Sequence, residues 1–285
     1  MADPARNRDP APGVDVCHVA LVQTAAGTDS AAQRESVRGW CGRVLEQPGP
    51  PADLVVLPEA VMHDFGSAEH DVAAVAEPLD GPFVALLAEQ AARLGAVVVA
   101  GMFERADDGG RPYNTLAAVQ PDGSLAGVSR KVHMYDSFGY RESDRLRAGP
   151  VEPVVLEVGA VNVGVMTCYD LRFPEYARLL VDAGADTLCV PAAWVRGPMK
   201  EDHWVTLLRA RAIENTCWVL GAAQTGPTYA GRTSAIDPLG VVLAAAGDEE
   251  TIVRAVLDPV RLGTARARNP ALQHRRISSG ARLQV

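Results

Sequence analysis

The part of the sequence that decides the fold reads Val163-Gly164-Val165-Met166-Thr167-Cys168-Tyr169-Asp170-Leu171-Arg172-Phe173-Pro174-Glu175. An apolar run typical of a β-strand ends at Cys168, and the sequence then becomes polar and helix-like. A side chain at such a corner projects from the edge of the sheet instead of into a core. The backbone N–H groups after the corner favour an anion, so we expect them to lower the pKa of the thiol. Because the thiolate is the reactive form, Cys168 is a candidate nucleophile.

Two further side chains of complementary chemistry follow similar runs. Glu59 comes after the apolar run 54–58, and Lys131 comes after the run 125–130. Taken singly, a cysteine at a strand end is usually a small apolar residue, and most Glu and Lys side chains are solvated. Three complementary groups that each end a β-like run are not what a solvated surface produces. Together they indicate a catalytic cluster.

Several motifs occur in the order found in one known superfamily. They are Leu57-Pro58-Glu59, Arg130-Lys131-Val132-His133-Met134-Tyr135-Asp136, the segment 168–175, His203-Trp204, the segment 208–215, and Asp237-Pro238-Leu239-Gly240. On these residues the chain, from 16 to 276, resembles the carbon–nitrogen hydrolase superfamily, also called nitrilase-like. Within it, the sequence is most similar to amidases that act on deaminated glutathione and on ω-amides of keto acids. One departure is Gly231-Arg232-Thr233, where those amidases commonly have Gly-His-Ser.

The resemblance implies a fold. It is a single α/β domain (α+β type) built as a four-layer α-β-β-α sandwich, with the catalytic residues at one end of the paired sheets. It also implies a homodimer or a higher homo-oligomer. Residues 1–15 are expected to be a disordered lead-in, 16–260 the hydrolase domain, and 261–285 a basic tail that packs at the dimer interface. The alternatives for this tail, which has six arginines and no acidic residue, are a solvated basic end and, in third place, contact with nucleic acid.

The resemblance also implies site residues. Glu142 is expected to orient Lys131, and Tyr135, Tyr169 and Trp194 to bind substrate. Arg172 is a candidate for a substrate carboxylate, with Arg196 as a second one. Without the resemblance, Glu142 is only a loop carboxylate and Trp194 follows a strand end. Arg172 has the alternative role of fixing the turn through ion pairs.

The elements read from periodicity and turn residues agree with this architecture. We expect strands at 16–23, 54–57, 96–103, 114–120, 124–130, 154–158, 161–167, 187–190, 218–223, 233–236, 241–246 and 252–257, and helices at 30–46, 82–94, 174–183 and 202–216. Residues 132–149 form a long loop of low periodicity, a type of loop that is often functional.

Composition excludes several classes. A net charge of −8 and a pI near 5.3 argue against a nucleic-acid-binding protein. The longest apolar runs contain Glu, Gly and Pro and are too polar to span a bilayer, so no membrane association is expected. Five cysteines without paired spacing indicate a reduced, cytoplasmic protein. No glycine-rich nucleotide loop and no metal-ligand spacing occurs, so we predict neither a cofactor nor a metal.

These observations predict an amidase with Glu59, Lys131 and Cys168 as its triad. The expected substrate is a small linear carboxamide that carries a carboxylate elsewhere, such as an ω-amide of a 2-oxo acid or a deaminated peptide, and the only expected partner molecules are this amide and water. The alternatives are an N-carbamoyl amino acid amidohydrolase with the same triad, a nitrilase, and a binding or scaffold module that has lost catalysis.

Overall fold

The computed structural model describes residues 15–277. It contains two six-stranded sheets. The first has the order β14 (Thr251–Leu257), β1 (Cys17–Gln23), β2 (Leu54–Val56), β3 (Val97–Glu104), β4 (Tyr113–Val119) and β5 (Leu125–Arg130). The second has the order β13 (Val242–Ala245), β12 (Ser234–Ile236), β11 (Trp218–Ala223), β10 (Thr187–Ala192), β9 (Val161–Val165) and β8 (Val155–Val158). Both sheets are mixed, with parallel strands at their centres.

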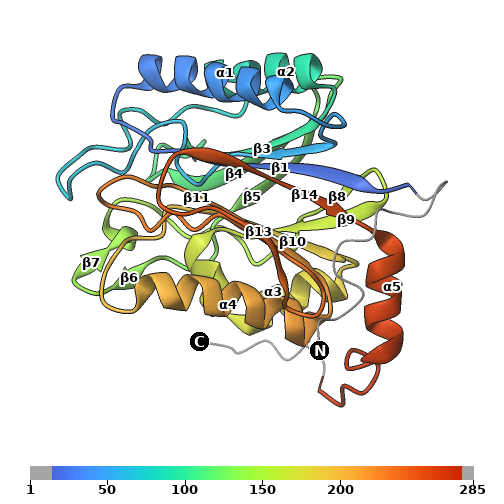
Figure 1. The fold of residues 1–285 in the computed structure, drawn as a ribbon. Coiled ribbons are helices and arrows are strands. Elements are labelled where there is room, and N and C mark those ends of the chain that lie inside the picture. The colour runs from blue at the N-terminus through green and yellow to red at the C-terminus, as the bar shows by residue number, and fades with distance from the viewer. Residues whose placement is uncertain (1–14, 278–285) are drawn as a thin grey trace.

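Helices cover the outer face of each sheet. Figure 1 shows α1 (Ser30–Glu46) and α2 (Pro82–Leu94) over the first sheet, and α3 (Pro174–Asp182) and α4 (Lys200–Asn215) over the second. The sheets face each other between these helical layers. The expected α-β-β-α sandwich, formed by a single domain, is confirmed.

Burial follows the period of two that a strand imposes. Along β1, Val19 and Leu21 belong to the core between the sheets, whereas Ala20 and Val22 belong to the core beneath α1 and α2. A third core lies beneath α3 and α4. Because both faces of the central strands are buried, these strands are mainly apolar and do not alternate between apolar and polar residues.

Most elements lie where the sequence predicts them, and the differences are local. The helices at 30–46 and 82–94 have the predicted bounds, whereas α4 starts at Lys200, two residues before the predicted start. The long loop contains a small hairpin, β6 (Asp136–Ser137) and β7 (Tyr140–Arg141), and the one-turn helix η1 (Glu142–Asp144). Both were missed because they are too short to show periodicity.

The C-terminal segment forms a helix that we did not predict, α5 (Pro259–Arg268). Asp258 caps it and Pro259 occupies its first turn, which are the usual starting signals of a helix. Leu262 and Ala265 are buried against the chain itself. Its role at a dimer interface stays a prediction, and residues 1–14 of the lead-in and 278–285 of the tail lie outside the described part of the chain.

None of the helices described between residues 15 and 277 is long and apolar enough to cross a membrane.

Candidate active site

The carboxylate of Glu59 is placed by the end of β2 and by its neighbour β3. The backbone of Gly101 in β3 accepts a hydrogen bond from Met62 N–H and donates one to the Pro58 carbonyl, at 3.1 Å each. A Cβ at position 101 would lie 2.3 Å from Ala60 N and 2.6 Å from the Cα of Glu59, so only glycine allows this approach. Ala60 has a φ of +52°, which turns the chain sharply after Glu59. The corner predicted from sequence is therefore a tight turn packed against β3.

Lys131 comes directly after β5. Its backbone N–H donates to the Asn114 carbonyl at 2.8 Å, and its own carbonyl accepts from Gly149 N–H at 2.8 Å. These bonds fix the main chain on both sides, so the buried side chain points into the space between the two sheet ends.

Cys168 is the first residue of the short helix η2 (Cys168–Arg172) and has a φ of +44°. This left-handed conformation is rare for a residue with a side chain and is found at functional corners. Asp170 holds the corner, since its Oδ2 accepts from Thr167 N–H at 3.1 Å and its Oδ1 accepts from His133 N–H at 2.9 Å. The Asp170 carboxylate therefore links the turn that carries Cys168 to the loop that follows Lys131.

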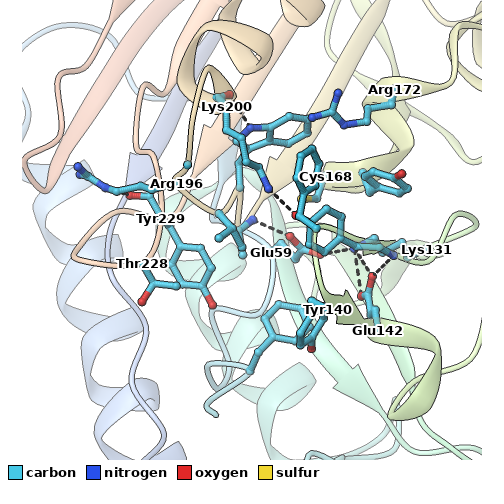
Figure 2. Close-up of a pocket in the computed structure, with 18 of the residues that line it drawn as sticks. Glu59, Lys131, Tyr140, Glu142, Cys168, Arg172, Arg196, Lys200, Thr228 and Tyr229 are labelled. Carbon is cyan, nitrogen blue, oxygen red and sulfur yellow. Dashed lines mark hydrogen bonds and ion pairs between the residues drawn. The ribbon is translucent and has the colours of Figure 1, made fainter. Parts of the chain in front are cut away.

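The three sequence-predicted charged groups meet in one buried network (Figure 2). Lys131 Nζ lies 3.0 Å from Glu59 Oε1 and 2.8 Å from Glu142 Oε2. The other oxygen of Glu59 accepts from Ala193 N–H at 2.5 Å, and Glu142 Oε2 accepts from Tyr135 N–H at 2.7 Å. Glu142 is thus brought against Lys131, as expected from the resemblance.

Asn114 is a member of this network that sequence reasoning missed. Its Nδ2 donates to Glu59 Oε1 at 2.7 Å and to Glu142 Oε1 at 3.0 Å. It therefore holds the two carboxylates on either side of the ammonium. The available signal was weak: a polar residue near the start of the apolar strand β4.

Burial and charge set the protonation of the two central groups. The pKa of the Cys168 thiol is raised well above its ordinary value by burial and by the carboxylate of Glu59, which Lys131 only partly offsets. This overturns the expectation that the corner lowers the pKa, because desolvation outweighs the nearby backbone N–H groups. For Lys131, burial acts to lower the pKa, but Glu142 and Glu59 outweigh it and raise the pKa well above its usual value. The resting site therefore has a neutral thiol beside a charged ammonium.

These groups line a cavity of about 560 Å³. Its walls also include all four predicted substrate-binding residues, Tyr135, Tyr169, Arg172 and Trp194. Such a volume suits a small molecule.

Arg172 does not fix the turn through an ion pair. No carboxylate between residues 15 and 277 pairs with it; its guanidinium lies 4.8 Å from the centre of the Trp194 ring and 3.4 Å from Nδ1 of His203. The carboxylate-binding alternative is the one that its position favours.

The cavity contains further residues that sequence reasoning did not single out, namely Lys200, Tyr140, Thr228 and Tyr229. Lys200 is almost fully buried at the start of α4. Arg196, a second carboxylate candidate, also lines the cavity (Figure 2). The only available signal for Lys200 was the rarity of its residue type, since the chain has two lysines and both are here.

The departure at Gly231-Arg232-Thr233 lies outside the cavity lining. Thr233 Oγ1 accepts from Ala223 N–H at 3.0 Å, and its backbone N–H donates to the Gln23 side chain at 2.8 Å. Thr233 therefore joins the two sheets, and Arg232 is exposed.

Among the described residues, no group of three or more His, Cys, Asp or Glu is arranged to hold a metal ion. The chemistry that the site offers is that of a thiol beside a carboxylate and an ammonium, groups that suit nucleophilic attack and the stabilisation of a developing negative charge.

Known proteins share this arrangement of elements. The carbon-nitrogen hydrolase family model matches residues 18–267. The chain is 40% identical to the deaminated glutathione amidase of Escherichia coli O157:H7 over 226 aligned residues, which are 79% of this chain and 85% of that protein. It is 34% identical over 245 residues to omega-amidase NIT2 of Danio rerio, covering 82% and 86%. The solved structure of XC1258 from Xanthomonas campestris, a CN-hydrolase superfamily protein, has a TM-score of 0.82 and 31% identity, covering 92% of this chain and 98% of that one. The chain therefore belongs to the carbon-nitrogen hydrolase family.

Proposed function

We propose that this protein is an amidase that cleaves the C–N bond of a small linear carboxamide through a thioester on Cys168. The observation that carries the proposal is the buried cluster of Glu59, Lys131 and Cys168 in the 560 Å³ cavity. Family membership and the amidase names of two relatives support it.

Acylation begins from the neutral thiol. As Cys168 Sγ attacks the amide carbon, its proton passes to Glu59, whose carboxylate is close enough to raise the thiol pKa. The carbonyl oxygen becomes an oxyanion that the Lys131 ammonium and the Tyr169 N–H stabilise. When the intermediate collapses, the C–N bond breaks and Glu59 gives the proton to the departing nitrogen. Ammonia, or an amine from a substituted amide, leaves, and the thioester remains.

Deacylation uses the same groups in reverse order. Water approaches the thioester and gives a proton to Glu59 as its oxygen attacks the carbonyl carbon. The C–S bond then breaks, Glu59 returns the proton to sulfur, and the carboxylic acid product departs. Glu142 keeps Lys131 charged and in place throughout, because it accepts a hydrogen bond from the ammonium while remaining fixed by Tyr135 N–H.

The substrate class follows from the cavity. Aromatic side chains, Trp194 among them, can enclose an apolar chain, and Arg172, which has no carboxylate partner between residues 15 and 277, offers a site for a carboxylate. An ω-amide of a 2-oxo acid or a deaminated peptide meets both requirements. An N-carbamoyl amino acid meets them as well and remains the second candidate, since it also carries a carboxylate and a cleavable C–N bond.

The test is product release from a panel of ω-amides, N-carbamoyl amino acids and nitriles, measured for the wild type and for Cys168→Ala. We expect ammonia from ω-amides with the wild type only. Carbon dioxide together with ammonia would identify the N-carbamoyl activity, and turnover of nitriles alone a nitrilase. No turnover of any of these compounds would favour a binding or scaffold module.

We also propose a cytoplasmic homo-oligomer, at least a dimer. Support comes from five cysteines that are all free and from exposed apolar side chains near the C-terminal region, including Leu243, Val260 and Ile277. Light scattering of the purified protein is expected to give a mass of at least twice 30.2 kDa. A monomer at micromolar concentration would contradict this part of the proposal.

A further inference from the structure

The cavity holds a second ammonium that the proposed chemistry does not use. The chain has only two lysines, and both line this cavity. Lys131 lies between two carboxylates, but Lys200 has no carboxylate partner in the described part of the chain. Its Nζ contacts the hydroxyl of Tyr135 and lies 4.6 Å from the centre of that ring and 4.8 Å from the ring of Phe138.

This position is unfavourable for a positive charge in the empty protein. Lys200 is 4% exposed and is the first residue of α4, where the helix dipole is positive. Burial lowers the pKa of Lys200, and the charge of Arg172 acts in the same direction, whereas Cys168 and the neighbouring carboxylate of Glu201 only partly oppose this lowering. A buried ammonium without an anion costs free energy, and an uncharged side chain of similar length would fill the same space without that cost. An anion bound beside the Lys200 ammonium would offset this cost.

Arg172 lies on the same wall of the cavity, and Trp194 contacts both Arg172 and the backbone of Lys200. The indole N–H donates to the Lys200 carbonyl at 2.8 Å, while the guanidinium of Arg172 lies over the same ring. The Nε atom of Arg172 is buried and has no hydrogen-bond partner among residues 15–277. Figure 2 shows Lys200 and Arg172 on one side of the cavity that Cys168 also lines.

We propose that Lys200 and Arg172 together bind a carboxylate on the acyl part of the substrate, which makes Lys200 the residue that selects monoamides of dicarboxylic acids. This inference rests on the proposed amidase function. A guanidinium offers a planar pair of N–H donors, and an ammonium adds a point charge from another direction. The carboxylate is assigned to the acyl part because the acyl group stays attached to Cys168 in the thioester, and Lys200 and Cys168 line the same cavity.

The first test compares substrate preference in Lys200→Met and the wild type. The substrates are glutaramate, which has an acyl-side carboxylate, the neutral pentanamide, and N-butyrylglycine, whose carboxylate is on the amine side. We expect the ratio of kcat/KM for glutaramate to that for pentanamide to fall about 10- to 100-fold, the effect of losing a charged hydrogen bond. Arg93→Met removes one positive charge from the exposed surface of α2, outside the cavity, and should leave the ratio unchanged. An unchanged ratio in Lys200→Met, or a loss confined to N-butyrylglycine, would overturn the proposal.

Two further variants separate charge from packing. Lys200→Gln keeps an N–H donor for Tyr135 without the charge and should lose the preference as Lys200→Met does, whereas Lys200→Arg should retain part of it. If Lys200→Met fails to fold, Lys200→Gln provides the same comparison. Equal preference in Lys200→Gln and the wild type would show that the residue acts only by packing, and the proposal would be wrong.

A binding measurement separates this inference from the proposed function. Calorimetry with glutarate, the dianion related to the expected product, is carried out on Cys168→Ala with and without Lys200→Met. We expect the Kd to rise at least about tenfold when the ammonium is removed. If no amide is hydrolysed by the wild type but this rise is found, the proposed function fails and the anion site stands. If amides are hydrolysed and the Kd does not depend on Lys200, only the inference fails.

Discussion

At the scale of the residue, the environment of Cys168 determines how catalysis can start. The thiol is buried beside Glu59, and its pKa is raised by desolvation first and by that carboxylate second. A preformed thiolate would place two negative charges side by side, which Lys131 alone does not compensate. In some cysteine enzymes a cationic base holds the cysteine as a thiolate before the substrate binds. Here the structure favours a neutral thiol that gives its proton to Glu59 as the sulfur attacks.

Glu59→Gln is expected to have opposite effects on reactivity and turnover. Removing the carboxylate removes one cause of the raised pKa, so the pH midpoint for alkylation of Cys168 by iodoacetamide should move down. Turnover should fall about 10²- to 10⁴-fold, because the general base is lost. Alkylation followed by mass spectrometry across a pH series checks the first effect, with Glu77→Gln, a carboxylate paired with Arg34 outside the cavity, as the control. A midpoint that stays in place or moves up would contradict this account of the thiol.

Glu142→Gln should reduce kcat more than it changes KM. Lys131 would lose one of the two carboxylates that keep its pKa raised, and its ammonium would be held less firmly. We expect kcat to fall about 10- to 100-fold, as for the loss of a hydrogen bond to a charged group. Steady-state kinetics on an ω-amide checks this. A change confined to KM would mean that Glu142 contacts the substrate and does not position Lys131.

At the scale of the element, the site depends on how closely β3 approaches the turn after β2. Gly101→Ala is expected to destabilise the protein by about 1–3 kcal/mol, because its Cβ would overlap the backbone at Glu59 and Ala60. Activity should fall as well, since Glu59 has to move. Gly39→Ala on the surface of α1 is the matched control, because nothing lies within 4 Å of its Cβ, and it should stabilise the protein slightly. Chemical denaturation and kinetics measure both variants, and equal behaviour would contradict the packing argument.

The element scale also shows how much the sequence could predict. The helices at 30–46 and 82–94 were predicted with their observed bounds, because apolar residues recur at helical spacing in both. In addition, Pro82 marks the start of the second helix and Gly95 marks its end. Glu59, Lys131 and Cys168 were identified because each ends an apolar run. Asn114 and Lys200 were not, because their roles depend on which strand and loop ends meet in space. Helix α5 was missed because the many arginines after residue 260 favoured the interpretation as a tail. Asp258 and Pro259 are nevertheless usual starting signals of a helix.

At the scale of the whole molecule, all five cysteines are buried, and the pKa of each is raised by burial, to about 12 for Cys17 and Cys41. A raised folded-state pKa means that the folded protein retains a proton that the unfolded chain releases. The resulting stability is fully present below the unfolded-state pKa, near 9.0, and is lost as the pH rises towards about 12.

Thermal unfolding is therefore expected at clearly lower temperature at pH 10 than at pH 7.5, under reducing conditions. Each such thiol contributes a stability loss of about 1.4 kcal/mol in total between these two pH values, because the slope approaches about 1.4 kcal/mol per pH unit only above the unfolded-state pKa. Cys17→Val should make the fall shallower, because one of these groups is removed. A melting temperature that does not change between the two pH values would show that the buried thiols do not govern alkaline stability.

The central claim is that a thioester forms on Cys168, in the cavity where the ends of the two sheets meet. The most direct measurement is intact-protein mass spectrometry after rapid mixing with an excess of an ω-amide and acid quenching. The account predicts a mass increase equal to the acyl group minus one hydrogen, located on the peptide that contains Cys168 and absent from Cys168→Ala, which should not hydrolyse the amide. Hydrolysis by Cys168→Ala at the wild-type rate, or an acyl group on another residue, would contradict it.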